Sequence, residues 1–457
     1  MKPHPYCSGF FLAVFLLTAI LFTPSVYVQG AAKAVSPTAS DSEHEALKML
    51  SEYLIQAASQ NPELESAFYR WKAATERIPQ EKTLPDPDFT FEYFLRSSAG
   101  ARPDKYGLMQ KFPWFGVLDL KGEIAGQEAN AAKAEYDALR LRVFFEVKEA
   151  FYEYAYLSNA IQVSSQEIEL LRFLESVVSA RYSAGATSYD DVIRTQVQLG
   201  KQEDTLRSFE DMRKPLMARL ASILNLAEGT HLPMPPVVPV MVMSLSDKEI
   251  LAQFPDSSPE IKKYEHLKAL EKAGVDLSKK QYYPEFSLGL EYENAMGDAG
   301  LEGMPGSNTT EPLRAVVSIN IPFWWERRKA GVREAEAKRF SAELEHRAAR
   351  QKVTSEIHMA LFKYRDAMRK IDLYLNTLVP KAEEALEVTL EAFQTGVRSS
   401  MDLIDAQQTL LEFELASIRS LADQALAFAR LEMLLGKEIP CEIHGAVLPT
   451  RGGVPRP

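Results

Sequence analysis

The chain has 457 residues but only two cysteines, no excess of positive charge, and no long apolar run after residue 22. Cys7 precedes the first apolar run and Cys441 stands alone, so we expect no intramolecular disulfide once the N-terminal segment is removed. The net charge of −11 argues against nucleic-acid binding, which needs a basic patch. Glycine-rich phosphate loops, clustered metal ligands and nucleophile motifs are also missing from the sequence. We therefore expect no enzymatic activity, no cofactor and no metal site.

The N-terminal segment predicts secretion. Residues 10–22 are apolar, Lys2 precedes them, and small residues follow at 30–32. This pattern is typical of a cleaved signal peptide, which we place at residues 1–32. An uncleaved membrane helix is the alternative, although the run is shorter than the ~20 residues that a spanning helix needs. No later stretch is long and apolar enough to span as a helix, so a membrane-embedded form would use strands.

The remainder of the chain is an internal duplication. Residues 87–89 (PDF) match 284–286 (PEF), and residues 191–196 (DVIRTQ) match 402–407 (DLIDAQ). The offset is 197 residues at the first match and 211 at the second, because the second repeat has a longer loop between its strands. Several further matches keep these offsets, which chance would not produce. The predicted parts are a first repeat at 41–231, a Pro-rich linker at 232–245, a second repeat at 246–437 and a flexible tail at 438–457.

Each repeat contains a pair of alternating strands, at about 88–112 and about 285–321. Phe89, Phe91 and Tyr93 show the alternation in the first pair. Period-two alternation gives one apolar and one polar face. Such a pair fits either a soluble hairpin or transmembrane barrel strands that face lipid on one side. A proline occurs at each predicted strand–helix junction: Pro87, Pro113, Pro284 and Pro322.

Two long helices follow each strand pair, at about 114–183 and 188–226 in the first repeat and at about 323–395 and 399–436 in the second. Residues 114–182 contain no proline, and core positions recur there with the four-three spacing of a coiled coil from Val143 to Leu171. One helix of ~65 residues would span roughly 100 Å, too long for a compact globule. Pro380 predicts a kink or break in the third long helix.

Two motifs resemble the TolC family of outer-membrane efflux and secretion channels. Residues 396–405 (GVRSSMDLID) resemble the gate-forming turn and inner helix of that family. Residues 84–87 (LPDP) are similar to a motif in the branch that includes the heavy-metal channels CzcC and CusC. The resemblance covers nearly the whole mature chain and implies a duplicated, mainly α fold with a β-barrel part.

Barrel closure requires an oligomer, because the open edges of four strands would leave backbone groups unsatisfied in lipid. The resemblance implies a homotrimer, in which four strands per protomer form a 12-stranded transmembrane β-barrel. A long α-helical barrel then continues this β-barrel into the periplasm.

The resemblance further implies that the chain is the exit duct of a tripartite efflux system in the outer membrane of a Gram-negative bacterium. It would sit in outer-membrane lipid and passively conduct heavy-metal ions or drugs. A periplasmic adaptor and an inner-membrane pump of the RND type would supply them. Two alternatives stay open: the outer-membrane channel of a type I protein secretion system, and a periplasmic coiled-coil scaffold or adaptor.

The same resemblance assigns roles at the turns between the long helices. Asp402 and Asp405 match the aspartates that ring the closed periplasmic mouth, and Arg398 matches the arginine that locks it by bonding to a neighbouring protomer. Asp190 and Asp191 hold the partner positions in the first repeat. The turns expected to contact the adaptor contain Gly185, Ala186, Thr187, Gly396 and Val397.

Helix capping offers another explanation for several of these residues. Gly185 and Gly396 fit C-caps, where glycine tolerates the left-handed conformation. The patterns Ser188-x-x-Asp191 and Ser399-x-x-Asp402 fit capping boxes with Asp in place of Glu. Asp405 lies one turn further along its helix and caps nothing.

Two smaller groups of residues each allow two interpretations. The first group lies around the linker: His231, Met234, Met241 and Met243. These side chains are soft ligands that suit copper or silver. They would equally suit an apolar linker that packs against the helices. Three tryptophans after the strands fit either interfacial aromatic residues or the packing of helix starts: Trp114, Trp324 and Trp325.

Overall fold

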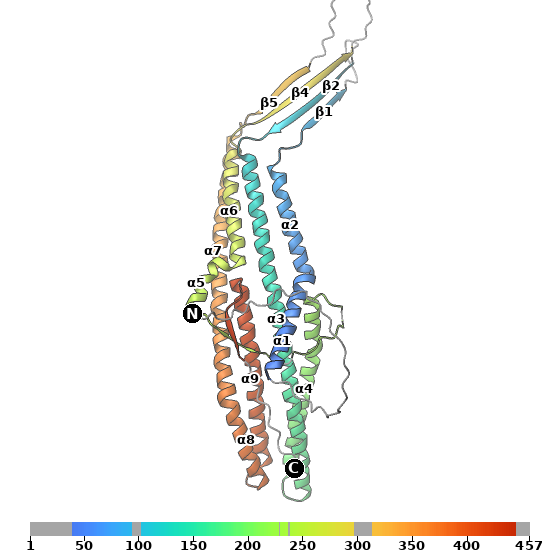
Figure 1. Cartoon of the computed structure of the whole chain (residues 1–457), viewed down its shortest axis with the longest axis vertical. Coiled ribbons are helices and arrows are strands. Elements are labelled where there is room, and N and C mark those ends of the chain that lie inside the picture. Colours follow the sequence, from blue (N-terminus) through green and yellow to red (C-terminus); the bar gives the residue numbers. More distant parts are fainter. Residues whose placement is uncertain (1–38, 94–101, 228, 236–237, 297–312, 445–457) are drawn as a thin grey trace, which may run out of the picture. The chain divides into compact units, whose positions relative to one another are not determined.

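The two halves of the chain share one order of elements (Figure 1). This computed structural model describes residues 39–93, 102–227, 229–235, 238–296 and 313–444, and the predicted signal peptide lies outside them. After α1 (Ala39–Gln60), the first half runs α2 (Pro62–Lys82), β1 (Asp88–Tyr93), β2 (Arg102–Phe112), α3 (Val117–Ser183) and α4 (Tyr189–Ile223). After β3 (Val240–Met243) and α5 (Asp247–Ser257), the second half runs α6 (Pro259–Lys280), β4 (Glu285–Met296), β5 (Leu313–Asn320), α7 (Trp325–Leu373), a π-helix (Tyr374–Leu378), α8 (Val379–Gln394) and α9 (Ser400–Leu435).

The chain divides into two compact units. Of the described residues, the first unit contains 39–64, 138–258 and 353–444, with both helical hairpins. The second unit contains 65–137 and 259–352, with the large sheet and the helices next to it in sequence. No helix in the described part of the chain combines the length and the apolarity that crossing a membrane requires.

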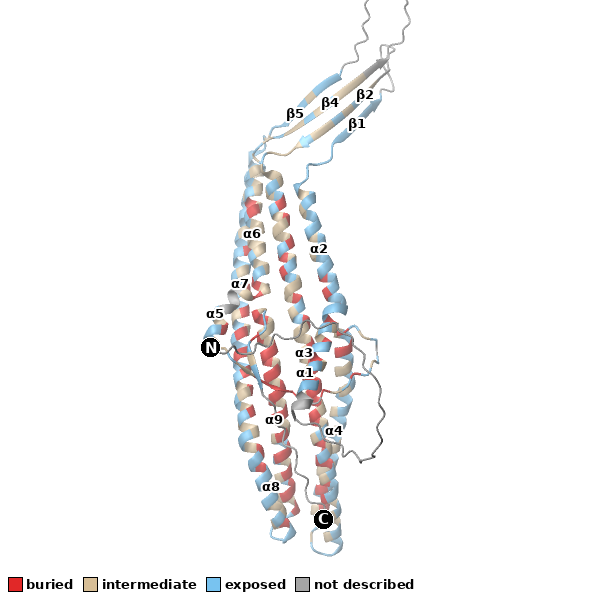
Figure 2. Ribbon diagram, viewed as in Figure 1, coloured by how far each residue is buried: buried red, intermediate tan, exposed pale blue. Residues whose placement is uncertain are grey.

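The core of the first unit is built on the predicted coiled-coil face of α3, and Figure 2 shows the buried stripes on its helices. Ile161 is half-buried, and the other positions of the four-three pattern are buried: Val143, Val147, Ala150, Tyr154, Leu157, Ser164, Ile168 and Leu171. On α9, Leu410, Leu421 and Leu431 are buried as well. Each fully buried leucine contributes roughly 1.5–3 kcal/mol, so packing of these faces holds the long helices together.

The predicted interruption at Pro380 is confirmed. Proline has no amide hydrogen and its ring crowds the carbonyl four residues earlier, which here belongs to Asn376. The backbone widens into the π-helix Tyr374–Leu378 directly before Val379 and Pro380. The third long helix is therefore α7 and α8, joined through this wider turn.

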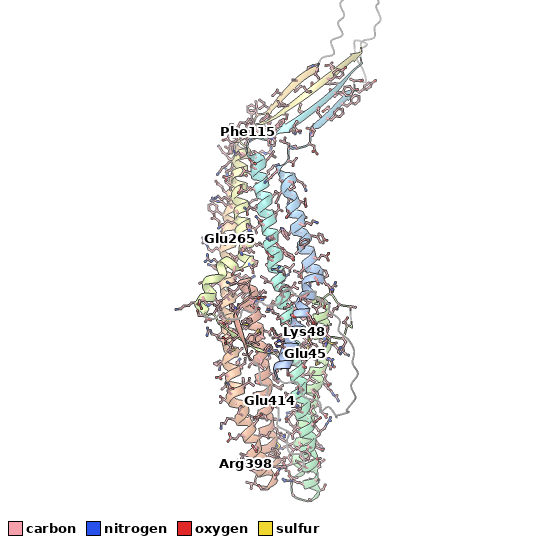
Figure 3. All side chains as sticks on the ribbon, viewed as in Figure 1. Glu45, Lys48, Phe115, Glu265, Arg398 and Glu414 are labelled. Atoms are coloured by element: carbon pink, nitrogen blue, oxygen red, sulfur yellow. The ribbon has the colours of Figure 1, made fainter. Side chains whose placement is uncertain are left out.

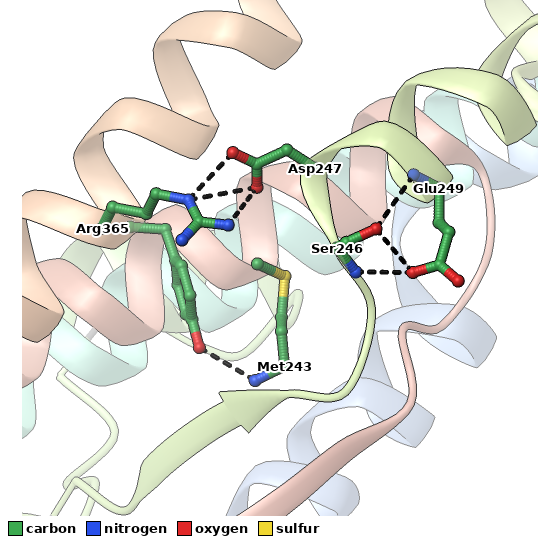
Figure 4. Close-up of polar contacts among 6 residues, drawn as sticks. Met243, Ser246, Asp247, Glu249 and Arg365 are labelled. Atoms are coloured by element: carbon green, nitrogen blue, oxygen red, sulfur yellow. Dashed lines mark hydrogen bonds and ion pairs between the residues drawn. The ribbon is translucent and has the colours of Figure 1, made fainter.

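A two-stranded sheet corrects the prediction of a flexible tail at 438–457. Strand β3, inside the predicted linker, pairs antiparallel with β6 (Cys441–His444), while residues 445–457 lie outside the described residues. The Tyr364 hydroxyl donates to the Met241 carbonyl and accepts from the Met243 amide, both at 2.9 Å. Figure 4 shows the second of these bonds. Strands of four residues that pair across distant parts of the chain leave too short a pattern to recognise in the sequence.

Helices α1 and α5 were not among the predicted elements. The start of α5 has a signal that sequence reasoning missed, because Ser246-x-x-Glu249 is a capping box. The Ser246 amide donates to the Glu249 carboxylate at 2.8 Å, and the Glu249 amide donates to the Ser246 hydroxyl at 3.4 Å (Figure 4). Asp247, the first residue of α5, binds the Arg365 guanidinium on α7 at 2.5–3.1 Å.

The four predicted strands form one antiparallel sheet of order β1-β2-β4-β5 in the second unit. The register places apolar side chains together on one face, and they are exposed in the protomer: Phe89, Phe91, Tyr93, Tyr106, Leu108, Leu288, Leu290, Leu313, Val317 and Ile319. Gly289 permits close approach of β4 to β2, since a Cβ there would lie 2.8 Å from the Leu108 carbonyl oxygen.

The opposite face of this sheet is polar and ion-paired. Lys105 on β2 binds Glu291 on β4 at 3.1 Å, and Lys111 on β2 binds Asp88 on β1 at 2.9 Å. Arg314 on β5 pairs with Glu293 on β4. Neighbouring strands are thus linked by charges on one face. The other face is mainly apolar, with Asp104 opposite Tyr93 and Gln110 opposite Leu288 as polar exceptions. This is the two-faced pattern that the alternation of the sequence predicts.

Candidate functional site

The turns of the two helical hairpins hold most of the predicted site residues, and both turns belong to the first unit. Each turn begins with a glycine in the left-handed conformation, Gly185 at φ 73° and Gly396 at φ 79°. The Ala186 amide donates to the Arg181 carbonyl at 2.8 Å, and the Val397 amide donates to the Ala392 carbonyl at 2.9 Å. Both turns are therefore Schellman caps, and glycine is needed at them for its backbone freedom.

Each turn ends in a capping box that starts the next helix. The Ser188 hydroxyl accepts from the Asp191 amide, and the Asp191 carboxylate accepts from the Ser188 amide at 3.2 Å. Ser399 and Asp402 repeat this arrangement, with the Ser399 amide 3.0 Å from the Asp402 carboxylate. Capping therefore explains Asp191 and Asp402 locally, before any partner is considered.

The two capping carboxylates have different third partners. Thr187 donates its hydroxyl to Asp191 at 2.5 Å, and this bond, with those from Ser188, lowers the pKa of Asp191. At the second turn, the Ser399 amide and hydroxyl, followed by the Arg398 guanidinium, lower the pKa of Asp402. The Arg398 Nη1 atom lies 3.6 Å from Asp402 Oδ1; the Arg398 side chain is exposed and the Asp402 side chain is partly exposed. Both aspartates are thus held as carboxylates.

The remaining two predicted gate aspartates differ in their surroundings. Asp190 binds Arg194 one helical turn later at 2.7 Å, an exposed pair within α4. Asp405 is exposed on α9, and its carboxylate has no hydrogen bond or ion pair with any residue that the structure describes. The second hairpin therefore presents one aspartate without a local partner.

Apolar packing holds the two turns at one end of the first unit. Side chains from α3, α4, α8 and α9 form one buried cluster: Leu174, Val178, Val192, Phe393, Leu403 and Ile404. The Arg181 guanidinium lies 4.0 Å from the centre of the Phe393 ring and donates to the Phe393 carbonyl at 3.0 Å. Sequence reasoning missed this clamp between α3 and α8, because only the fold brings two residues so far apart in the chain together. Val397, by contrast, is exposed at the second turn.

The junction prolines lie in the second unit. Pro87 and Pro284 stand directly before β1 and β4, and Pro113 and Pro322 stand shortly after the ends of β2 and β5. Proline is tolerated there because a strand end does not need its amide hydrogen. The structure therefore brings the turn residues together, whereas these prolines only mark the ends of the strands.

The model of the outer membrane efflux protein family matches the chain twice, over residues 54–226 and 251–437. The chain belongs to this family. The two matched segments coincide with the two halves that share one order of elements. As an outer membrane efflux protein, it serves transport and is located in the outer membrane, with its helical part in the periplasm.

Individual relatives of this outer membrane efflux protein are distant but extensive. It is 21% identical over 409 residues to nodulation protein T of Rhizobium leguminosarum bv. trifolii, covering 85% of each chain. It is 20% identical over 392 residues to the cobalt-zinc-cadmium resistance protein CzcC of Cupriavidus metallidurans, covering 83% of this chain and 88% of CzcC. The solved structure of the outer membrane protein VceC of Vibrio cholerae matches with a TM-score of 0.73 at 17% identity, over 88% of this chain and 100% of VceC, which shows a shared fold.

Proposed function

We propose that this outer membrane efflux protein is the trimeric exit duct of a tripartite system, gated at its hairpin turns. The observation that carries the proposal is the four-stranded sheet, with one exposed apolar face and one ion-paired polar face. An apolar face of this size is costly in water and stable against lipid, whereas the charged face suits a water-filled lumen.

Closure of the sheet argues for the oligomer. Strands β1 and β5 each pair on one side only among the described residues, and lipid does not tolerate such open edges. Pairing of β1 in one protomer with β5 in the next removes every edge. Three protomers then give a 12-stranded barrel, whose lumen carries the charges of the polar face.

We propose that the gate lies at Arg398, Asp402 and Asp405. In a trimer, Asp405 contributes three carboxylates that repel one another and attract cations at the mouth. Both oxygens of Asp402 are already engaged, by Ser399 and by Arg398. Arg398 holds Asp402 only at 3.6 Å, so its guanidinium can instead bind a carboxylate of a neighbouring protomer and lock the closed state. We assign adaptor contact to the exposed Val397 turn and to its counterpart at Gly185, Ala186 and Thr187.

The cargo that we propose is a small solute, either a heavy-metal ion or a drug, delivered by an adaptor and an RND-type pump. The metal-resistance name of CzcC supports the first class, because that relative aligns with most of this chain. The charged lumen face and the proposed aspartate ring would favour cations. The channel itself needs no catalytic step, since the pump supplies the energy.

The full chain, expressed in a Gram-negative host, tests this proposal. We expect trimers in the outer-membrane fraction that dissociate on heating, and cation-selective conductance from the purified protein in planar bilayers. A protein found only as a soluble periplasmic monomer would contradict the proposal and favour the scaffold alternative.

A further inference from the structure

Aromatic residues at the junctions between sheet and helices separate into two groups by exposure. Trp114 is half-buried and stacks on Tyr283 at a ring-centroid distance of 5.0 Å, so it packs the start of α3. Trp324 and Trp325 are instead 75% and 56% exposed just before and at the start of α7. Phe115, labelled in Figure 3 at the junction before α3, is 72% exposed. The structure thus distinguishes helix packing at Trp114 from exposed aromatic surface at both junctions, although the Trp325 ring also contacts Tyr282 at a centroid distance of 5.8 Å.

We name the exposed set Phe115, Phe323, Trp324 and Trp325 the aromatic collar. It continues the apolar face of the sheet, because Val317, Ile319 and Ile321 lead along β5 and its end towards Phe323 and are each more than half exposed. Among the described residues, an open hollow of about 610 Å³ is lined by residues 323–327. Exposed indole and phenyl rings are stable at a boundary between apolar and aqueous phases.

Positive charge lies directly beside the collar. Residues 327–329 are Arg, Arg and Lys. Arg328 donates to the Gln281 carbonyl at 2.7 Å, and Lys329 binds Glu326 at 2.9 Å. Arg327 is exposed and has no partner among the residues that the structure describes. The hollow therefore combines apolar ring surface and the Glu326 carboxylate, which Lys329 pairs, with the Arg327 guanidinium, whose hydrogen-bond donors bond no described residue.

We propose that the aromatic collar and Arg327 bind an anionic phospholipid headgroup of the leaflet that faces the periplasm. A guanidinium binds phosphate oxygens through paired hydrogen bonds, while the indoles of Trp324 and Trp325 cover the glycerol and upper acyl chain. Charge complementarity and the continuity of the collar with the apolar sheet face select a lipid as the occupant. The inference rests on the proposed membrane position of the sheet.

The test uses quenching of tryptophan fluorescence by brominated phospholipids. Trp71→Phe and Trp114→Phe together leave Trp324 and Trp325 as the reporters in the full chain. This reporter protein is placed in vesicles of phosphatidylcholine with equal small fractions of either brominated phosphatidylglycerol or brominated phosphatidylcholine. If the double variant does not assemble, the same signal is obtained as the difference between the unmodified chain and Trp324→Phe/Trp325→Phe.

We expect stronger quenching by brominated phosphatidylglycerol, corresponding to about a fivefold preference for the anionic lipid at the collar, the ratio that ~1 kcal/mol per surface cation gives. Arg327→Glu should remove this preference. Arg347→Glu is the matched control, because Arg347 is also exposed on α7 and has no partner among the described residues, but lies roughly 30 Å further along the helix. It should retain the preference.

Conductance measured on the same samples separates this inference from the proposed function. A protein that conducts and is quenched equally by both brominated lipids would overturn the anionic site and leave the duct intact. A protein that conducts but is not quenched at all would show that the collar faces protein, such as a neighbouring protomer, and would also overturn the inference. Absence of both conductance and quenching would contradict the duct itself.

Discussion

At the residue scale, the two hairpin turns use the same backbone and differ in charge. The glycine caps and serine capping boxes were predictable, because they depend on residues within one turn of each other. Under the repeat offset, Thr187 and Arg398 occupy equivalent positions beside Asp191 and Asp402. A short neutral donor thus bonds the capping carboxylate of the first turn, whereas a long cationic side chain lies beside that of the second. In the proposed trimer, the partners of Arg398 depend on neighbouring protomers, which a single sequence does not specify.

Arg398→Ala should shift the channel toward its open state. An exposed ion pair contributes ~0.5 kcal/mol, so losing one in each of three protomers would change the closed-to-open ratio roughly tenfold. Single-channel recording in planar bilayers measures this change as higher mean conductance. Arg172→Ala is the matched control, because Arg172 is similarly exposed and binds Glu203 at 2.8 Å within the first hairpin. Equal conductance in the two variants would remove Arg398 from the gate.

At the element scale, the long periodic segments were predictable and the short ones were not. The coiled-coil face of α3 extends over many turns, so its pattern outweighs local exceptions. Strands β3 and β6 have four residues each and gain their stability from distant partners. Gln424, fully buried on α9, donates to the Met241 carbonyl, and Tyr364 bonds the same strand from α7. These side chains satisfy backbone groups that a two-stranded sheet leaves unpaired.

Tyr364→Phe should weaken the anchoring of β3 without creating a cavity in the core. The ring stays, but the Met241 carbonyl loses one donor and the Met243 amide loses its acceptor, at a cost of about 1–3 kcal/mol. Hydrogen–deuterium exchange over residues 238–246 should become faster. Tyr374→Phe is the control, because the Tyr374 ring contacts Phe413 while its hydroxyl bonds no described residue. Unchanged exchange at β3 in Tyr364→Phe would refute this anchoring role.

At the scale of the whole molecule, the duplication and the two-faced sheet were visible in the sequence, because both are repeating patterns. The number of protomers was not predictable from the residues. Open strand edges show only that four strands cannot form a barrel alone, and they do not fix how many protomers close it. Single residues of the apolar face, such as Leu290 at 53% exposure, remain uncovered in the protomer. The protomer alone therefore does not show whether lipid or water covers these residues in the assembly.

Two adjacent residues on β5 distinguish these environments. Val317 lies opposite Leu288 on the apolar face, and Ser318 lies opposite Ser287 on the polar face. Both are exposed in the protomer, so an arginine at either position should affect an isolated protomer similarly. In a lipid-embedded trimer, Val317→Arg should cost up to ~2–4 kcal/mol per protomer near the bilayer centre, whereas a lumen-facing Ser318→Arg remains hydrated. We expect Val317→Arg to abolish most of the heat-dissociable trimer in outer-membrane fractions and Ser318→Arg to retain it. Similar losses in both variants would mean that the apolar face does not meet lipid.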